Sequence, residues 1–166
     1  MASMHSPLER PAVRILETRL VSVPIAHACL KAPRDAAVVI HRLIGDADRE
    51  HFVALYLNAR HEITHAHVVS CGTVQSAPVH PREVFKGALL ANAAAIVVGH
   101  NHPSGDVNPS PEDERIVERL RSAGELMGVE LLDSLIVGPS GRFYTAADNR
   151  VFPLPAEALE VADGPD

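Results

Sequence analysis

Hydrophobic and polar residues recur with two different periods along the chain, and these periods predict its helices and strands. Apolar side chains fall at helical spacing in three stretches that are bounded by proline, glycine or both: 34–44, 81–92 and 110–127. Alternating or continuous apolar runs, typical of strands, occupy five others: 51–58, 63–70, 93–98, 129–137 and 142–145. Because the two kinds of element interleave, the pattern predicts an α/β fold with a mixed sheet and helices on its faces.

The length and the character of the two ends predict one folded domain. A chain of 166 residues can enclose one substantial core, and the near absence of aromatic residues (4%, with no Trp) makes that core aliphatic. Residues 1–12 are polar and contain two prolines, and residues 153–166 are acidic with further prolines. We therefore expect a domain over residues 13–152 between a flexible N-terminus and a flexible tail.

Charge and composition narrow the classes of partner. The formal net charge is −6 and no run of Lys or Arg stands out, so direct binding to nucleic acid is not expected. No apolar run approaches the roughly 20 residues that span a bilayer, and no signal peptide is recognisable, so we expect no membrane partner. Two cysteines provide no disulfide framework, which favours the cytoplasm. The sequence does not specify an oligomeric state.

Polar residues with metal-binding chemistry follow the most apolar predicted strand. Residues 96–98 are Ile-Val-Val, and after Gly99 the chain continues with His100, Asn101 and His102. In extended backbone, residues two apart face the same way, so the two imidazoles can bind one ion while Asn101 points away. Asp113, in the first turn of the next helix, can bring a carboxylate back over the strand end. Two His and one Asp leave a fourth position for water, as in catalytic zinc sites.

Simpler interpretations exist for each part of this constellation. Ser110 followed by Asp113 three residues later is also the pattern of a helix N-cap with a capping box. A chain with ten His contains His-x-His pairs by chance. Capping and metal chemistry are compatible, because the Ser110 hydroxyl can cap the helix and still face the ion. The spacing His-x-His, seven residues, Ser, two residues, Asp indicates a site more strongly than any of its parts.

A second metal-binding pattern, His61-Glu62-Ile63-Thr64-His65, matches the HExxH signature of zinc peptidases. That signature requires a helix, where residues four apart lie about 6 Å from each other on one face. On a strand the same two residues lie about 13 Å apart, too far to share an ion. Because Ile63, Thr64 and the valines that follow favour a strand, we expect no site here. His61, His65 and His67 should then lie on one exposed face of that strand.

The segment 100–113, HNHPSGDVNPSPED, resembles the RadC-like branch of the JAB/MPN (JAMM) metalloprotease family, and its HNHPSG hexapeptide is highly specific. Shorter similar segments extend the resemblance over roughly residues 15–147: 50–52, 71–73, 79–86 and 131–133. The resemblance implies a three-layer α/β fold, a mixed sheet with helices on both faces as in cytidine deaminases. Full-length RadC proteins usually carry an N-terminal helix-hairpin-helix portion, so we expect a short form without it.

The resemblance also implies roles for individual residues. His100, His102 and Asp113 match the ligands of a zinc ion, Zn²⁺. Ser110 matches the residue that helps to hold the tetrahedral intermediate. Glu50 matches the upstream acid and base, a role that the spacing of residues does not assign. A carboxylate at the start of a buried strand could take a proton from water and pass it to the leaving amine.

Glu50 also has a simpler interpretation, and this chain differs from the family at two positions. Glu50 ends the polar run 46–50, which is also typical of a solvated strand entrance, and Glu62 and Glu83 are alternative acids. Family members commonly have His where this chain has Ser134, and Thr where it has Val117. Neither position matches a ligand, but the Ser134 difference bears on whatever that His does near the site.

Two functions follow as hypotheses. The first is a zinc-dependent peptidase or isopeptidase that acts on a peptide or protein substrate. The second is a non-catalytic binding module in DNA repair or maintenance. The acidic charge balance and the lack of a helix-hairpin-helix portion argue against direct DNA contact.

Overall fold

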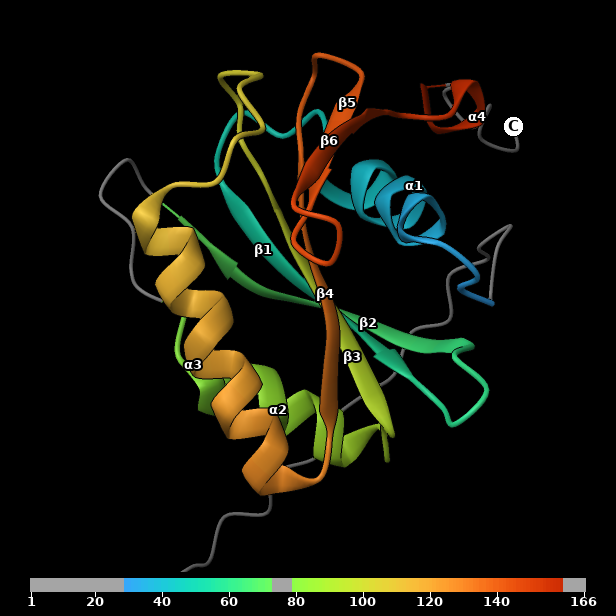
Figure 1. Cartoon of the computed structure of the whole chain (residues 1–166), viewed down its shortest axis with the longest axis vertical. Helices are drawn as coiled ribbons and strands as arrows, with labels where there is room; N and C mark the ends of the chain where they lie inside the picture. Colours follow the sequence, from blue (N-terminus) through green and yellow to red (C-terminus); the bar gives the residue numbers. More distant parts are fainter. Residues whose placement is uncertain (1–28, 73–78, 160–166) are drawn as a thin grey trace, which may run out of the picture.

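The computed structural model describes residues 29–72 and 79–159. In this part of the chain four helices and six strands form an α/β fold (Figure 1). The elements in chain order are α1 (Pro33–Ile44), β1 (His51–Leu57), β2 (Ile63–Cys71), α2 (Pro81–Leu90), β3 (Ala95–Asn101), α3 (Pro111–Met127), β4 (Glu130–Val137), β5 (Arg142–Thr145), β6 (Arg150–Pro153) and α4 (Ala156–Leu159). No helix among these residues is both long and apolar enough to cross a membrane.

The strands form one mixed sheet in the order β2-β1-β3-β4-β5-β6. β3 and β4 are parallel, and all the other neighbours are antiparallel. The parallel pair is joined by α3, which crosses over one face of the sheet and begins near the end of β3. Since β1 runs opposite to β3, the first residues of β1 lie beside the last residues of β3, with Phe52 opposite His100.

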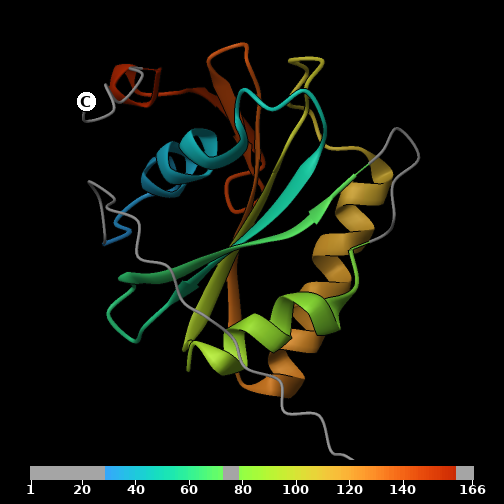
Figure 2. The ribbon, with the colours of Figure 1, turned by 180° about the vertical axis from the view of Figure 1, so that it is seen from behind.

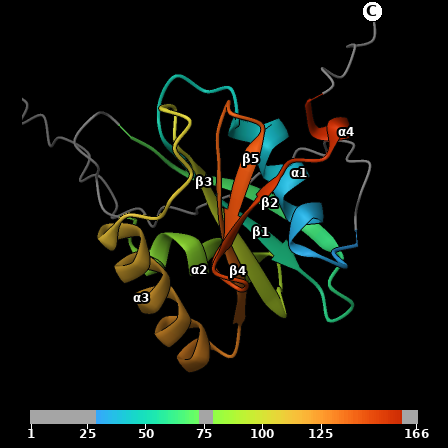
Figure 3. The same cartoon turned by 45° about the horizontal axis from the view of Figure 1, so that its top comes forward.

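Helices cover both faces of the sheet, as the sequence predicts. α1 and α4 lie on one face and α2 and α3 on the other, which Figure 3 shows with the top of the molecule tilted forward and Figure 2 shows from behind. β1 contributes alternate side chains to the two cores: Val53, Leu55 and Leu57 toward α1, and Phe52, Ala54 and Tyr56 toward α2 and α3. Both faces of this strand are apolar because both are buried.

The observed elements follow the predicted ones with one consequential difference. The three long helices and the hairpin of β1 and β2 are confirmed. The third strand was predicted over 93–98, whereas β3 runs from Ala95 to Asn101. His100 and Asn101 are polar but pair with β4 on one side, and His100 pairs with β1 on the other. Hydrophobicity could not show this, because backbone pairing does not depend on side-chain polarity.

The C-terminal part contains two elements that the sequence pattern does not predict. Within the tail expected over residues 153–166, β6 extends to Pro153 and α4 follows it. Leu154 and Ala158 are buried in the core beside α1. Proline is tolerated here because β6 is an edge strand. The expected flexible N-terminus 1–12 and residues 160–166 lie outside the described residues.

Close packing of α2 on β1 depends on Gly87. The buried Tyr56 hydroxyl donates to the Val84 carbonyl (2.9 Å), and a Cβ atom at position 87 would overlap that hydroxyl. We expect Gly87→Ala to lower the free energy of unfolding by about 1–3 kcal/mol through overpacking, although Ala is the better helix former. Urea denaturation of the purified protein measures the change.

Tyr56→Phe provides the control, since it removes the nearest of the overlapping atoms, the hydroxyl oxygen, and keeps the ring carbons Cζ and Cε2, which a Cβ atom at position 87 would also approach too closely. In that background the cost of Gly87→Ala should fall but not vanish. Equal costs in the two backgrounds would show that the hydroxyl is not the obstacle.

Candidate metal centre

Three potential ligands from two elements converge at the end of β3. The distance between His100 Nε2 and His102 Nε2 is 3.0 Å, and Asp113 Oδ1 lies 3.1 Å from the former. Asp113 Oδ2 lies 3.7 Å from His102 Nε2. This group could hold a metal ion, because one ligand atom from each residue can be chosen so that all three lie within 4.8 Å of one another.

The spacing of these atoms fits a tetrahedral zinc ion. With bonds of about 2.0–2.2 Å, the edges of a tetrahedron measure roughly 3.3–3.6 Å. The two histidine nitrogens lie 3.0 Å apart, and each lies near a different oxygen of Asp113, at 3.1 Å from Oδ1 for His100 and 3.7 Å from Oδ2 for His102, so the distances are close to that range. Two imidazoles and one carboxylate are also donors that zinc accepts. Small shifts of side chains would therefore suffice to bind the ion.

Neighbouring groups orient both imidazoles. His102 Nδ1 lies 2.6 Å from the Asp106 carbonyl oxygen, so this nitrogen must donate, and Nε2 is the nitrogen left to bind a metal. The His100 ring stacks on Phe52, with 6.1 Å between ring centroids and 10° between planes. Its buried Nδ1 has no hydrogen-bond partner in the described part of the chain. Sequence reasoning missed Phe52, whose apolarity indicated only a core position.

Asp113 is held by the N-terminal cap of α3. Both the amide and the hydroxyl of Ser110 donate to Asp113 Oδ2, at 2.7 and 2.6 Å, and the Asp113 amide donates to Ser110 Oγ at 3.2 Å. Burial raises the pKa of the Asp113 carboxyl, but hydrogen bonds and charge from His100, with hydrogen bonds from Ser110, outweigh it and hold the pKa well below its usual range. The structure confirms the capping box of Ser110 and Asp113, and the same hydrogen bonds hold an ionised carboxylate beside the two histidines.

One cleft brings together all five residues that the sequence singled out. A cavity of about 840 Å³ has Glu50, His100, His102, Ser110 and Asp113 in its lining. Glu50 reaches it from the position before β1 and is exposed. Antiparallel pairing of β1 with β3 explains this proximity, because it places the start of one strand beside the end of the other.

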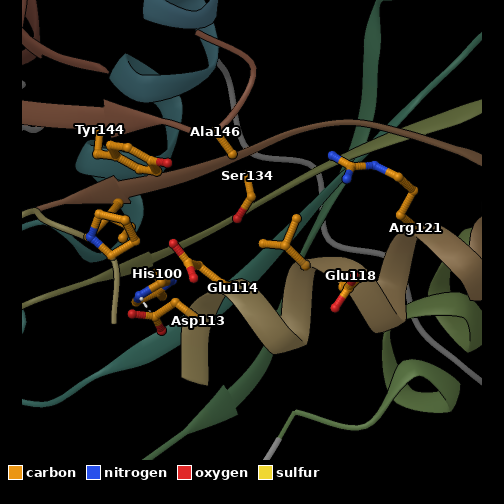
Figure 4. A pocket seen from close by; sticks show the side chains of 11 residues that line it. His100, Asp113, Glu114, Glu118, Arg121, Ser134, Tyr144 and Ala146 are labelled. Atoms are coloured by element: carbon orange, nitrogen blue, oxygen red, sulfur yellow. Dashed lines mark ion pairs between the residues drawn. The ribbon is translucent and has the colours of Figure 1, made fainter. Parts of the chain in front are cut away.

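A second, smaller cavity reaches the ligands from the other side. It has a volume of about 330 Å³ and includes His100 and Asp113 in its lining (Figure 4). Its remaining walls come mainly from α3, β4 and β5: Glu114, Val117, Glu118, Arg121, Ser134, Ile136 and Tyr144. The two departures from the family pattern, at 117 and 134, both lie in these walls. They alter the surroundings of the centre and leave the potential ligands unchanged.

The HExxH pattern does not form a site. Its second half lies on β2, which begins at Ile63, and His61 and His65 belong to no metal-ligand group among residues 29–72 and 79–159. The expectation that three histidines share the strand was wrong for His61, which precedes β2 with φ of 58°. His65 and His67 lie on the strand and are half-buried, not exposed.

The two alternative acids are engaged elsewhere. Glu62 accepts a hydrogen bond from Asn58 (2.6 Å), and Glu83 accepts one from Lys86 (2.9 Å). These hydrogen bonds lower the pKa of each carboxyl from its usual value. Neither acid lines the cleft at the ligands, whereas Glu50 does.

Comparison with known proteins supplies relatives for most of the described region. The profile of the RadC-like JAB domain matches residues 30–151. A UPF0758 protein of Shouchella clausii is 45% identical over 136 residues, which is 82% of this chain and 56% of that protein. A UPF0758 protein of Methanosarcina acetivorans is 40% identical over 135 residues, which is 81% of this chain and 57% of that protein. The chain spans about half the length of such curated relatives, and their names state no activity.

The cap at Ser110 predicts a measurable contribution to stability in the metal-free protein. Ser110→Ala removes the hydroxyl that bonds Asp113, and we expect the free energy of unfolding to fall by about 1 kcal/mol. The matched control is Ser122→Ala in the same helix, whose hydroxyl donates to the Glu118 carbonyl. That change should be neutral or slightly stabilising, because Ala is the better helix former. Equal effects in urea denaturation would contradict the capping role.

Proposed function

The chain belongs to the family of RadC-like JAB domains, and from this membership and the geometry of the centre we propose that it is a zinc-dependent hydrolase of amide bonds. Its substrate would be a peptide or protein, cleaved at a peptide or isopeptide bond. The observation that carries the proposal is the convergence of potential ligand atoms of His100, His102 and Asp113 within 4.8 Å of one another, in the lining of a cleft that also contains Glu50.

The three ligands define what a metal could do here. His100 and His102 would hold the ion through Nε2, and Asp113 would hold it through its carboxylate. Zinc held there would supply Lewis-acid chemistry, which polarises a carbonyl oxygen and makes water more acidic.

Glu50 would move the proton. It lines the cleft with the ligands, and nothing in the described part of the chain bonds its carboxylate. It can therefore accept a proton from the attacking water and donate it to the nitrogen of the broken amide bond. The hydroxyl group of the water then ends on the carbonyl carbon and its proton on the amine, so the products are an acid and an amine.

Ser110 would stabilise negative charge on the carbonyl oxygen of the substrate. Its hydroxyl donates to Asp113 Oδ2, so a rotation of the hydroxyl must precede any donation to substrate. Asp113 Oδ2 would keep the hydrogen bond from the Ser110 amide (2.7 Å) during that change. A donor placed where charge develops in the transition state lowers the barrier.

Metal analysis tests the ligand set directly. Wild-type protein loaded with zinc and then dialysed should retain about one ion per chain, and His102→Ala should retain almost none, because two ligands hold zinc poorly. His65→Ala is the matched control, since that half-buried His lies on β2 outside the ligand group. Mass spectrometry of metal content decides the question. Wild type without zinc, or His102→Ala with a full complement, would contradict the proposal.

A second test separates binding from proton transfer. We expect Glu50→Gln to retain zinc and to lose about 10²- to 10⁴-fold in kcat on a mixed library of peptides and Lys-linked isopeptides, read by mass spectrometry. Glu62→Gln is the control, because that acid is engaged in the β1–β2 hairpin. Unchanged turnover in Glu50→Gln, with zinc still bound, would remove Glu50 from the mechanism.

A further inference from the structure

Asn101 lies between the two histidine ligands in sequence but makes its contacts elsewhere. Because side chains alternate along β3, it points to the opposite face of the sheet from His100 and His102. It is fully buried, with 0% of its surface exposed. A buried side-chain amide needs partners for its two N–H groups and its oxygen, and those partners indicate what the residue does.

All three partners belong to the backbone segment that leads into β1. Asn101 Nδ2 donates to the carbonyl oxygens of Arg49 (2.9 Å) and Ala47 (3.3 Å). Its Oδ1 accepts from the His51 amide at 2.7 Å. Two acceptors on one side and a donor on the other allow only one orientation of the amide group. The segment 47–51 is thereby attached to the end of β3 by a single side chain.

Two of these hydrogen bonds hold the peptide units on either side of Glu50. The Arg49 carbonyl belongs to the peptide unit before Glu50, and the His51 amide belongs to the unit after it. The carbonyl of Glu50 itself accepts from the Gly72 amide (2.8 Å), at the end of β2. The Glu50 backbone is thus fixed from both neighbouring strands, whereas nothing in the described part of the chain bonds its carboxylate. The position of this carboxylate therefore depends on its backbone.

The alternation of β1 gives the direction of the Glu50 side chain. Phe52 stacks on the His100 ring, and the residue two positions earlier faces the same side of the strand. Glu50 accordingly lines the cleft that contains His100 and His102. Any shift of the segment 47–51 would move this carboxylate relative to the ligands.

We propose that Asn101 is a positioning residue, which holds Glu50 over the metal centre by bonding both peptide units that flank it. This inference rests on the role proposed for Glu50. Displacing a catalytic group by 1 Å can cost about a hundredfold in rate. Replacing the partners that orient a metal site typically costs about 10- to 100-fold in affinity or activity, and in this centre the loss should fall on kcat.

The test compares Asn101→Ala with Asn58→Ala. Asn58 is a matched control, because its side chain also bonds backbone amides, those of Arg60 (2.9 Å) and Glu62 (3.0 Å), at the far end of β1. For zinc-loaded Asn101→Ala we expect full metal content, kcat lower by about 10- to 100-fold on the best-cleaved library peptide, and KM changed less than about threefold. Asn58→Ala should leave kcat unchanged.

Two further measurements isolate the mechanism. Amide hydrogen exchange at His51 should be at least about tenfold faster in Asn101→Ala, while Ala54 and Leu55 inside β1 stay protected. In a Glu50→Gln background, Asn101→Ala should cause little additional loss of kcat, because the residue acts through Glu50. An equal loss in both backgrounds, unchanged exchange at His51, or loss of zinc would overturn the inference.

The exchange measurement separates this inference from the proposed function. If the wild-type protein binds zinc but cleaves no library member, the hydrolase proposal and the catalytic part of this inference are refuted. Faster exchange at His51 in Asn101→Ala would still show that Asn101 anchors segment 47–51. If Asn101→Ala does not fold, Asn101→Asp replaces it, since it keeps the volume and the acceptor and removes both donors. Full kcat in Asn101→Asp would equally overturn the inference.

Discussion

The antiparallel pairing of β1 with β3 is the constraint on which the candidate centre depends. With Phe52 opposite His100, the start of one strand lies beside the end of the other, so Glu50 reaches the cleft of the histidines. The parallel pairing of β3 with β4 requires a crossover, and α3 provides it. The crossover helix begins beside the last residues of β3 and brings Asp113 there. The start of β1, the end of β3 and the start of α3 thus meet at one end of the sheet because of the order and directions of the strands.

The residues that cap the start of α3 include a potential metal ligand. Ser110 and Asp113 satisfy amides that a helix N-terminus leaves without partners, and a negative charge is favourable at that end of a helix. This arrangement also holds the carboxylate ionised against the two imidazoles, although burial opposes the charge. A helix cap therefore prepares a potential metal ligand in the absence of metal.

Two His-rich patterns in the chain show that a motif depends on the element that carries it. The pair at 100 and 102 lies at the end of a strand, where residues two apart face one way and their Nε2 atoms come within 3.0 Å. The HExxH pattern at 61–65 needs a helix, but its second half lies on β2 and its first half in the preceding turn. Histidines near an acidic residue therefore form a potential metal-ligand group in one place and, among the described residues, none in the other.

The sequence by itself determined the helices, the two apolar faces of β1 and the grouping of His100, His102, Ser110 and Asp113. All of these depend on residues close together in the chain, where periodicity and capping act. It did not determine the true end of β3, the order in β6 and α4, the position of Glu50 beside the ligands or the contacts of Asn101. The bond from His51 to Asn101 joins residues 50 positions apart, and only the pairing of β1 with β3 decides that they meet. The resemblance to a family suggested Glu50 as an acid and base, but the register of β1 against β3 is what places it in the same cleft as His100 and His102.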